Sequence, residues 1–448
     1  MTNPERHIDT IDLVTSEISI GDEDITIDRK DEVALYSRSI AFSTSNGLIY
    51  PFVSIISLKL GASASILAWI QAVNNFLRQL LEPLFGRLTD FTKRRIPFIV
   101  ISTITWIIPY AFLYLVKAPE FIIVIVACVS ILNSLGNPAW YALQNEIFPK
   151  EVRGKFSSRV AWFGSFGSML ATLFTGIILT IAFGDIDYQK YILIPVAVGV
   201  FISIIAVLPF RKVKEPHQRP ELKIELTSRN VKESLKEVFS NKPFRKFAIL
   251  YSIFGLFWTF SWPLFSIKQV NILGATAVEI ALLEIIFAVT TLIFILIGGK
   301  LSDKIGRVRM IFMNRFILFL FPLLYIFATK IWHLYLVHFF ISSFFSFSFA
   351  GVNAYILDII PPKESGLYFG FLSLVTGIFY FIGTLSGGYM VEILQRWYSE
   401  NTALIIALAF VSGARFLLSF LFLSLKEVKD FPTTFKLMIK SLNIRKQK

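Results

Sequence analysis

The side chains in this sequence that could do chemistry are polar groups placed inside long apolar runs. In the run 63–86 they recur at intervals of three and four residues, which puts them on one face of a helix. This stripe consists of Gln71, Asn74, Asn75, Arg78 and Glu82. Polar side chains in a membrane are costly and usually face a bundle interior or a water-filled cavity. The stripe therefore predicts a cavity wall; the alternative is that these residues only join helices.

Other apolar runs contribute polar residues to the same predicted cavity. Asn133 and Asn137 are four residues apart in the run 122–144, so they also share a helix face. Trp258 and Trp262 could stack on a sugar or an aromatic solute, and packing within the membrane explains them equally well. The residues that we expect to line the cavity are Asn46, Gln71, Asn74, Asn75, Arg78, Asn133, Asn137, Trp258, Trp262 and Asn353.

Two carboxyl groups are candidates for carrying a proton. Glu284 lies near the middle of the run 276–299 and has no cation to pair with in its own helix. Burial favours the uncharged form of a carboxyl, so Glu284 could bind and release a proton within the membrane. Glu82 is the second candidate, but it lies one turn from Arg78, and the two could instead neutralise each other.

The other charged or titratable groups in the runs are expected to be structural. Arg315 and Arg415 would hold helices together or extend their charged ends to the membrane surface. His333 and His338 are five residues apart near a membrane boundary, so we expect interface residues. They do not have the spacing of four that a metal pair on a helix needs. We expect no metal and no other cofactor.

These groups belong to a chain whose composition is that of a membrane protein. Of its 448 residues, 55% are hydrophobic and 17% are charged, against about 25% charged in soluble domains. About twelve apolar runs have the roughly 20 residues needed to cross a bilayer. Lys and Arg lie mainly between the runs, so the formal net charge of +13 indicates membrane topology and not nucleic-acid binding. The single cysteine, Cys128, excludes a disulfide within the chain.

The loops that connect the apolar runs repeat. The segments 86–95 and 299–309 share the order Gly, basic residue, Leu, hydroxyl residue and Asp, and the numbering of their aspartates differs by 303 − 90 = 213. We call these segments the signature loops. The segments 146–154 and 358–366 repeat with an offset of 366 − 154 = 212. Two repeats at nearly the same offset indicate two equivalent halves, which is a common transporter architecture.

The motif Gly-x-Leu-Ser/Thr-Asp-x-x-Gly-Arg-x-Arg/Lys in the signature loops resembles that of the major facilitator superfamily. The second copy matches it fully, and the first has Lys93 in place of the second glycine. The resemblance covers about residues 35–425 and implies an all-α polytopic membrane protein with twelve transmembrane helices in two pseudo-symmetric six-helix bundles. It also implies that Asp90 and Asp303 engage helix starts of the opposite half when the cytoplasmic side is closed. The residues of this gate would be Gly86, Asp90, Arg94, Arg95, Glu146, Arg153, Gly299, Asp303, Gly306, Arg307 and Asp358.

The predicted domain organisation has five parts. We expect an acidic disordered cytoplasmic tail at 1–32, bundles at 33–210 and 246–425, a cytoplasmic linker with an amphipathic helix at 211–245, and a basic amphipathic tail at 426–448. The loops richest in Lys and Arg lie on the side of the signature loops, so the positive-inside rule places both termini in the cytoplasm. We expect a multi-pass protein of the cell membrane, and a monomer.

The sequence predicts a secondary transporter that moves a small solute by alternating access, with a co-transported proton as a second partner. A polar metabolite such as a sugar or an organic anion is favoured by the amide stripes, the tryptophans and Arg78. The alternative within transporters is export of hydrophobic compounds, suggested by the phenylalanines at 339–349. No P-loop, zinc-protease or hydrolase motif occurs, so an enzyme is not expected. The alternative of another class is a non-transporting membrane sensor with the same fold.

Overall fold

The computed structural model describes residues 15–20, 23–92, 94–147, 150–184, 188–213, 231–361 and 365–427. The elements of the first half are β1 (Thr15–Ile20), β2 (Glu23–Asp28), α1 (Arg29–Ile49), η1 (Tyr50–Phe52), α2 (Val53–Lys59), α3 (Ala64–Thr92), α4 (Ile96–Thr105), η2 (Ile108–Leu115), α5 (Phe121–Ile147), α6 (Lys150–Ala182), η3 (Tyr188–Ile192), α7 (Leu193–Val207) and η4 (Leu208–Lys212). Those of the second half are α8 (Val231–Ser240), α9 (Lys242–Phe260), α10 (Trp262–Ile267), η6 (Lys268–Ile272), α11 (Ala277–Ile305), α12 (Arg307–Ile317), α13 (Leu320–Phe327), α14 (Ile331–Ile359), α15 (Ser365–Leu394), α16 (Glu400–Leu421) and η8 (Phe422–Ser424).

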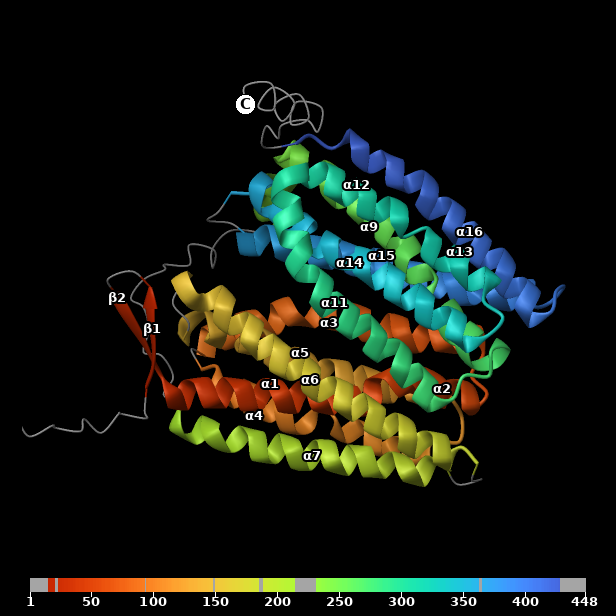
Figure 1. The fold of residues 1–448 in the computed structure, drawn as a ribbon, viewed down its shortest axis with the longest axis horizontal. Helices are drawn as coiled ribbons and strands as arrows, with labels where there is room; N and C mark the ends of the chain where they lie inside the picture. The colour runs from red at the N-terminus through yellow and green to blue at the C-terminus, as the bar shows by residue number, and fades with distance from the viewer. Residues whose placement is uncertain are drawn as a thin grey trace, which may run out of the picture.

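The helices form two bundles that lie side by side, with the first half below and the second half above in Figure 1. In the described part of the chain, ten segments are long and apolar enough to cross a membrane. The helices α3 and α14, of 29 residues each, complete the twelve that the sequence predicts. The predicted fold class, an all-α polytopic protein with twelve spans in two bundles, is confirmed.

Within each bundle, neighbouring helices approach closely at small residues. In the first half, the Thr172 Oγ1 on α6 donates to the carbonyl of Gly47 on α1 at 3.0 Å. In the second half, the Thr259 Oγ1 on α9 donates to the carbonyl of Tyr380 on α15 at 3.0 Å. A Cβ at Gly383 would lie 2.7 Å from that Thr259 hydroxyl, so glycine is needed for this approach. Small residues are typical of such membrane helix contacts.

The two bundles meet at two small-residue contacts that are related by the internal repeat. Gly176 on α6 faces Ala277 on α11, and a Cβ on this glycine would lie 3.1 Å from the Ala277 carbonyl oxygen. Gly388 on α15 faces Ala64 on α3, with 2.5 Å to the Ala64 carbonyl oxygen. The numbering of the glycines differs by 388 − 176 = 212 and that of the alanines by 277 − 64 = 213, which matches the offset of the signature loops. The pseudo-twofold relation therefore extends to the contact between the bundles.

Hydrogen bonds between the bundles lie at mid-depth or on the side away from the signature loops. In the part of the chain whose side chains are described, they join Trp69 to Tyr389 (3.0 Å), Gln71 to Ser266 (3.4 Å), Thr180 to Val278 (2.9 Å) and Gln79 to Thr376 (3.2 Å). The last of these is the nearest to the signature loops along α3. The bundles thus hold together on one side and lack such bonds, within the described residues, on the other.

The segment before α1 differs from the predicted disordered tail. Residues 15–28 form an antiparallel hairpin in which Ile18 pairs with Ile25 and Ile20 with Glu23. The sequence there alternates β-branched and polar residues on both sides of Gly21-Asp22, a two-residue hairpin signal. The helix α1 then begins at Arg29, before the expected bundle start at residue 33.

The linker between the halves contains the helix α8. Its Val238 is buried, and the Phe239 ring lies 5.0 Å from the Phe371 ring on α15, so α8 packs against the second bundle. Residues 214–230 of the linker and the predicted amphipathic tail at 428–448 are outside the described residues.

Candidate functional site

A cavity of about 400 Å³ lies between the two bundles, and the two halves line it with different chemistry. The polar side chains from the first half are amides and hydroxyls: Tyr50, Ser54, Gln71, Asn74, Asn75 and Tyr110. The second half contributes mainly rings: Trp258, Trp262, Phe265, Phe287, Phe321, Tyr325 and His338. It also contributes Ser266, Gln269 and the carboxylate of Glu284.

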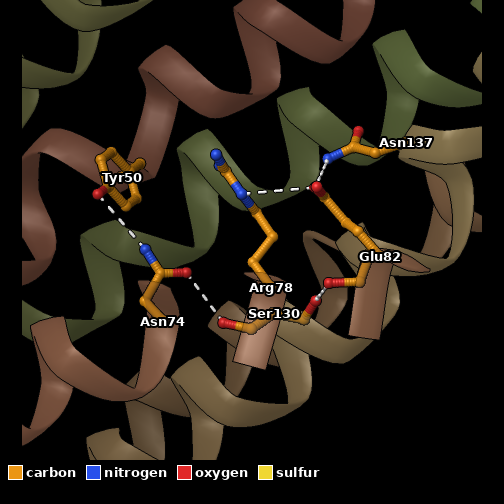
Figure 2. A network of polar contacts seen from close by, with 7 residues as sticks. Tyr50, Asn74, Arg78, Glu82, Ser130 and Asn137 are labelled. Atoms are coloured by element: carbon orange, nitrogen blue, oxygen red, sulfur yellow. Dashed lines mark hydrogen bonds and ion pairs between the residues drawn. The ribbon is translucent and has the colours of Figure 1, made fainter. Parts of the chain in front are cut away.

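The amide wall is organised by hydrogen bonds from the α3 stripe. The Asn74 Nδ2 donates to the Tyr50 Oη at 3.4 Å, and its Oδ1 accepts from the Ser130 Oγ at 2.9 Å (Figure 2). The Gln71 Nε2 lies 3.2 Å from the Ser54 Oγ and 3.4 Å from the Ser266 Oγ in the other bundle. Because Asn74 is held from α5 and η1, its position in the wall is fixed by three elements.

The charged end of the α3 stripe forms an ion pair next to the cavity. The Arg78 Nε lies 3.5 Å from the Glu82 Oε1, and that oxygen accepts from the Asn137 Nδ2 at 3.0 Å (Figure 2). None of the three is among the residues that line the described cavity. Glu82 therefore has a cation and an amide as partners, which is the neutralising arrangement considered from the sequence.

Glu284 on α11 has a different environment from Glu82. It is an exposed residue on the cavity surface, and among the described residues no hydrogen bond or ion pair is made by its side chain. The lining residues that are described contain no Lys or Arg. Its carboxylate is therefore available to a proton or to a ligand.

A chain of three side chains forms part of the opposite wall. The Gln269 Nε2 donates to the Tyr325 Oη at 2.8 Å, so the tyrosine O–H is left to donate to the His338 Nε2, also at 2.8 Å. The prediction that His338 is a membrane-interface residue is wrong, because the residue is buried and lines the cavity. The five-residue spacing between His333 and His338 does not reveal which helix this face of α14 packs against. In the structure, His338 contacts Tyr325 on α13. His333 is at the helix start, where its Nδ1 accepts from the Thr329 N–H at 3.3 Å.

Trp258 lines the cavity but is already engaged by its neighbours. Its ring stacks on Phe345 at 5.7 Å, and the Arg415 guanidinium carbon lies 5.0 Å from the ring centroid. Arg415 is fully buried and donates to the carbonyls of Phe257, Trp258 and Leu318 and to the Ser261 hydroxyl. These carbonyls lie where α9 and α12 end, so Arg415 is structural and does not extend to the membrane surface.

The predicted cavity residues thus divide into three groups. Five line the cavity: Gln71, Asn74, Asn75, Trp258 and Trp262. Four do not: Asn46, Arg78, Asn133 and Asn137. The side chain of the tenth, Asn353, is outside the described residues, and so are those of Arg153, Gly299 and Asp303 in the predicted gate.

At the signature loops, the described ion pairs stay within each bundle. The Arg95 Nη2 lies 2.7 Å from the Asp90 Oδ1 and 3.4 Å from the Glu146 Oε1. In the second half, the Arg307 Nε lies 3.5 Å from the Asp358 Oδ2. Asp90 is half exposed, and its described ion pair is with Arg95 of its own half.

Other gate residues have simpler surroundings. Gly306 has a φ of +103° immediately before α12, a conformation that favours glycine. Gly86 lies against Pro138, where a Cβ would be at an ordinary 3.5 Å. Arg94 is exposed.

One residue at this end was missed by the sequence interpretation. The Glu427 carboxylate accepts from the backbone N–H of Arg307 at 2.7 Å and of Val308 at 3.0 Å, so it caps the start of α12. The sequence does contain a pattern that could have indicated Glu427. The pair Lys426-Glu427 has the same residues as Lys214-Glu215, with an offset of 427 − 215 = 212. That is again the offset of the two halves.

Comparisons with known proteins agree with this architecture. The sequence model of the family described as Major Facilitator Superfamily matches residues 37–265 and 247–442. The tetracycline resistance protein, class H, of Pasteurella multocida is 32% identical over 120 residues, which are 27% of this chain and 30% of that protein. The chain thus matches less than a third of that relative's length. The uncharacterized transporter YwbF of Bacillus subtilis (strain 168) is 22% identical over 373 residues, covering 81% of this chain and 88% of YwbF.

Solved structures of similar fold include transporters of several kinds. The nucleoside transporter NupG has a TM-score of 0.66 at 14% identity, covering 89% of this chain and 99% of NupG. A D-xylose-proton symporter has a TM-score of 0.65 at 15% identity, covering 90% and 99%. A bacterial homologue of the lysosomal transporter Spinster, in an inward-facing and unoccupied conformation, has a TM-score of 0.60 at 14% identity, covering 90% and 98%. At these identities the likeness concerns the fold alone.

Proposed function

The chain belongs to the major facilitator superfamily, and we propose that it is a secondary transporter that moves a small solute by alternating access. The observation that carries this proposal is the cavity of about 400 Å³ that the two bundles share. Transporters built from repeated halves bind their cargo at the interface of the repeats. The volume is also within the usual range for small-molecule sites, about 300–1,000 Å³.

The described conformation is, in this proposal, open toward the cytoplasm. The hydrogen bonds between bundles lie at mid-depth or away from the signature loops, and the Lys and Arg of those loops indicate the cytoplasmic side. The ion pair of Asp90 with Arg95 of its own half supports a gate that is disengaged at this residue. The protein would then be a monomeric, multi-pass protein of the cell membrane with both termini in the cytoplasm.

The favoured solute is a polar metabolite such as a sugar or a nucleoside. Three amide side chains, Gln71, Asn74 and Asn75, line one wall, and amides hydrogen-bond both to hydroxyls and to carbonyls. The names of two structures of similar fold, a nucleoside transporter and a D-xylose-proton symporter, agree with this choice. An organic anion receives less support, because Arg78 is paired with Glu82 and does not line the cavity.

Export of hydrophobic compounds is the second candidate. It is favoured by the aromatic wall, which contains Phe265, Phe287 and Phe321, and by the partial similarity to a tetracycline resistance protein. Of the phenylalanines that first suggested this function, Phe339, Phe340 and Phe344 are exposed on α14 and do not line the cavity, and the side chains of Phe347 and Phe349 are outside the described residues.

Proton coupling through Glu284 completes the proposal. Its carboxylate lines the cavity without a described partner, whereas the carboxylate of Glu82 is bound to Arg78 and Asn137. Glu284 is therefore the better of the two candidates for a group that binds and releases a proton during transport.

Uptake by the purified protein in liposomes tests the proposed function. A panel of radiolabelled sugars, nucleosides and hydrophobic drugs is supplied outside, and saturable uptake is measured for the wild type and for the double variant Gln71→Ala and Asn74→Ala. We expect at least one polar solute to enter, with uptake reduced about tenfold or more by the double variant. Glu120→Gln, at an exposed residue outside the cavity, is the control. Absence of flux for every solute would contradict the proposal.

A further inference from the structure

We infer that the solute carries a positive charge, so that the cavity is a site for a small organic cation, a protonated amine or a quaternary ammonium, with a polar group at its other end. This inference rests on the proposed transport through the shared cavity, and it replaces the neutral sugar or nucleoside favoured above by a polar solute that carries a positive charge. It starts from the unequal chemistry of the two cavity walls: amides and hydroxyls in the first half, rings and a carboxylate in the second.

The charge balance of the cavity is the first step. Among the lining residues that the structure describes, Glu284 is the one carboxylate, and neither Lys nor Arg is present. The other titratable lining groups are His338 on α14, Tyr325 on α13, Tyr50 in η1 and Tyr110 in η2. Because Glu284 is exposed to the cavity and the described lining has no Lys or Arg, its carboxylate attracts a cation that enters the cavity.

The nearby cations are committed to other partners. The Arg78 Nε is paired with Glu82, and the Lys268 Nζ donates to the Asn401 Oδ1 at 3.1 Å. Arg415 donates to backbone carbonyls behind Trp258. These three side chains have described partners other than Glu284, so we expect the positive charge that pairs with Glu284 to come from the solution, as a proton or as part of the solute.

The rings favour a solute cation over a proton alone. Trp262, Phe265, Phe287 and Tyr325 line the same half of the cavity as Glu284. The faces of aromatic rings attract alkylammonium groups, and aromatic cages are a recurring way to bind them. A carboxylate that only binds and releases a proton does not need aromatic rings around it. The amides of Gln71 and Asn74 on the facing wall would bind the polar end of the solute.

A matched pair of compounds tests the inference directly. Choline and benzyltrimethylammonium are the cationic probes, and 3,3-dimethylbutan-1-ol is the neutral isostere of choline. Binding to the full-length protein in detergent is measured by thermal shift and by isothermal calorimetry. We expect choline to bind at least about tenfold more tightly than its neutral isostere, because the Glu284 carboxylate attracts only the charged compound.

Variants separate the carboxylate from the rest of the fold. Glu284→Gln should lose the preference for the cation, Glu284→Asp should keep part of it, and Glu120→Gln, at an exposed residue outside the cavity, should keep all of it. The inference is overturned if the neutral isostere binds as tightly as the cations, or if Glu284→Gln binds the cations as the wild type does. Should Glu284→Gln fail to fold, the comparison of choline with 3,3-dimethylbutan-1-ol on the wild type decides alone.

The same experiment distinguishes failure of the inference from failure of the proposed function. If neutral sugars or nucleosides bind and cross liposomes equally in wild type and Glu284→Gln, the proposed transporter function is supported and the inference of a cationic solute is refuted. If no solute of either kind bound or crossed, the proposed function itself would be wrong.

Discussion

Arg415 and Glu284 are both charged residues of membrane-spanning helices, but one has a structural role and the other is a candidate ligand-binding residue. Arg415 is fully buried, and its donors are taken up by three backbone carbonyls and one hydroxyl. Glu284 lines a cavity and has no described partner. A satisfied charge stabilises the positions of its neighbours, whereas an unsatisfied one leaves a place for a ligand. A charged residue in the membrane therefore has a structural role when its side chain has partners, and is a candidate binding residue when it has none, whatever its depth in the membrane.

Arg415→Met is predicted to destabilise the second bundle. It removes several charge-assisted hydrogen bonds and leaves carbonyls unpaired at the ends of α9 and α12, so we expect the free energy of unfolding to fall by about 3 kcal/mol. Thermal unfolding in detergent would measure this. The matched control is Arg396→Met at an exposed arginine, which should change the melting temperature little. Equal stability of the two variants would show that Arg415 is not structural.

Glu284→Gln is predicted to abolish uphill accumulation driven by a proton gradient. The amide keeps the shape of the side chain but cannot bind and release a proton. The measurement is accumulation of solute in liposomes with and without an imposed pH difference. Full accumulation by the variant would refute a role for Glu284 in proton coupling, and Glu82 would then be the remaining candidate.

The sequence predicted the lining of the candidate site in part. Gln71, Asn74 and Asn75 were found by their spacing on α3. The spacing also allowed the pair of Arg78 and Glu82, but it could not show that this pair is outside the cavity lining. Trp258 and Trp262 were predicted, but the other rings of this wall and His338 were missed, because aromatic residues are common throughout membrane helices. Their role depends on which faces the two halves turn toward each other, which no local pattern encodes.

At the element scale, the helices are positioned by small residues and by caps. The glycines of α6 and α15 let these helices approach α11 and α3 of the opposite bundle. At the other end, Glu427 joins the end of the second bundle to the start of α12. Contacts within each bundle, such as Thr172 with Gly47 and Thr259 with Tyr380, are separate from these, so each bundle could move as a unit, which alternating access requires.

Gly388→Leu is predicted to open the side away from the signature loops. A side chain there would collide with Ala64 and Ala68 on α3, so the contact between bundles could not form as described. In a Cys128→Ser background, a cysteine introduced by Phe91→Cys, at a residue 86% exposed, reports on the signature-loop side. We expect thiol labelling at this position to slow in the variant as the other conformation becomes populated.

Gly413→Leu is the control, because a side chain at Gly413 would meet open space. Unchanged labelling in Gly388→Leu, with the protein still folded, would show that this contact does not control the conformation.

Glu427→Ala is predicted to loosen the start of α12. Loss of a carboxylate that caps a helix typically costs about 1–2 kcal/mol. The expected result is faster hydrogen exchange at the amides of Arg307 and Val308, which Glu427 accepts from in the structure, together with a lower melting temperature. Glu427→Gln should lie between the alanine variant and the wild type. Exchange at wild-type rates in the alanine variant would contradict the capping role.

The elements themselves were largely predictable, and the exceptions have local causes. Apolar length and the repeated loops gave the twelve spans and the two halves, because a bilayer imposes length and apolarity on every crossing segment. The hairpin of β1 and β2 was missed because acidic composition outweighed the alternation on both sides of Gly21-Asp22. The Glu427 cap was missed because its partners are backbone groups far away along the chain, at the start of α12.

For the whole molecule, the internal repeat accounts for both the fold and its proposed motion. Pseudo-equivalent contacts, Gly176 with Ala277 and Gly388 with Ala64, join the bundles on one side of a shared cavity. The Asp90 and Asp303 signature loops are at the other side, where the resemblance to the family predicts a latch in the closed state. The two sides would therefore open alternately, with the cavity as the fixed point between them.

Paired distances across the two sides test this motion most directly. In a Cys128→Ser background, spin labels are attached through Phe91→Cys and Leu357→Cys on the signature-loop side, and through Phe121→Cys and Tyr398→Cys on the opposite side, all at exposed residues. The distances are measured by electron paramagnetic resonance in lipid nanodiscs, with and without a bound solute. We predict reciprocal change: conditions that shorten the first distance lengthen the second. Two distances that stay constant, or that change in the same direction, would contradict alternating access by this chain.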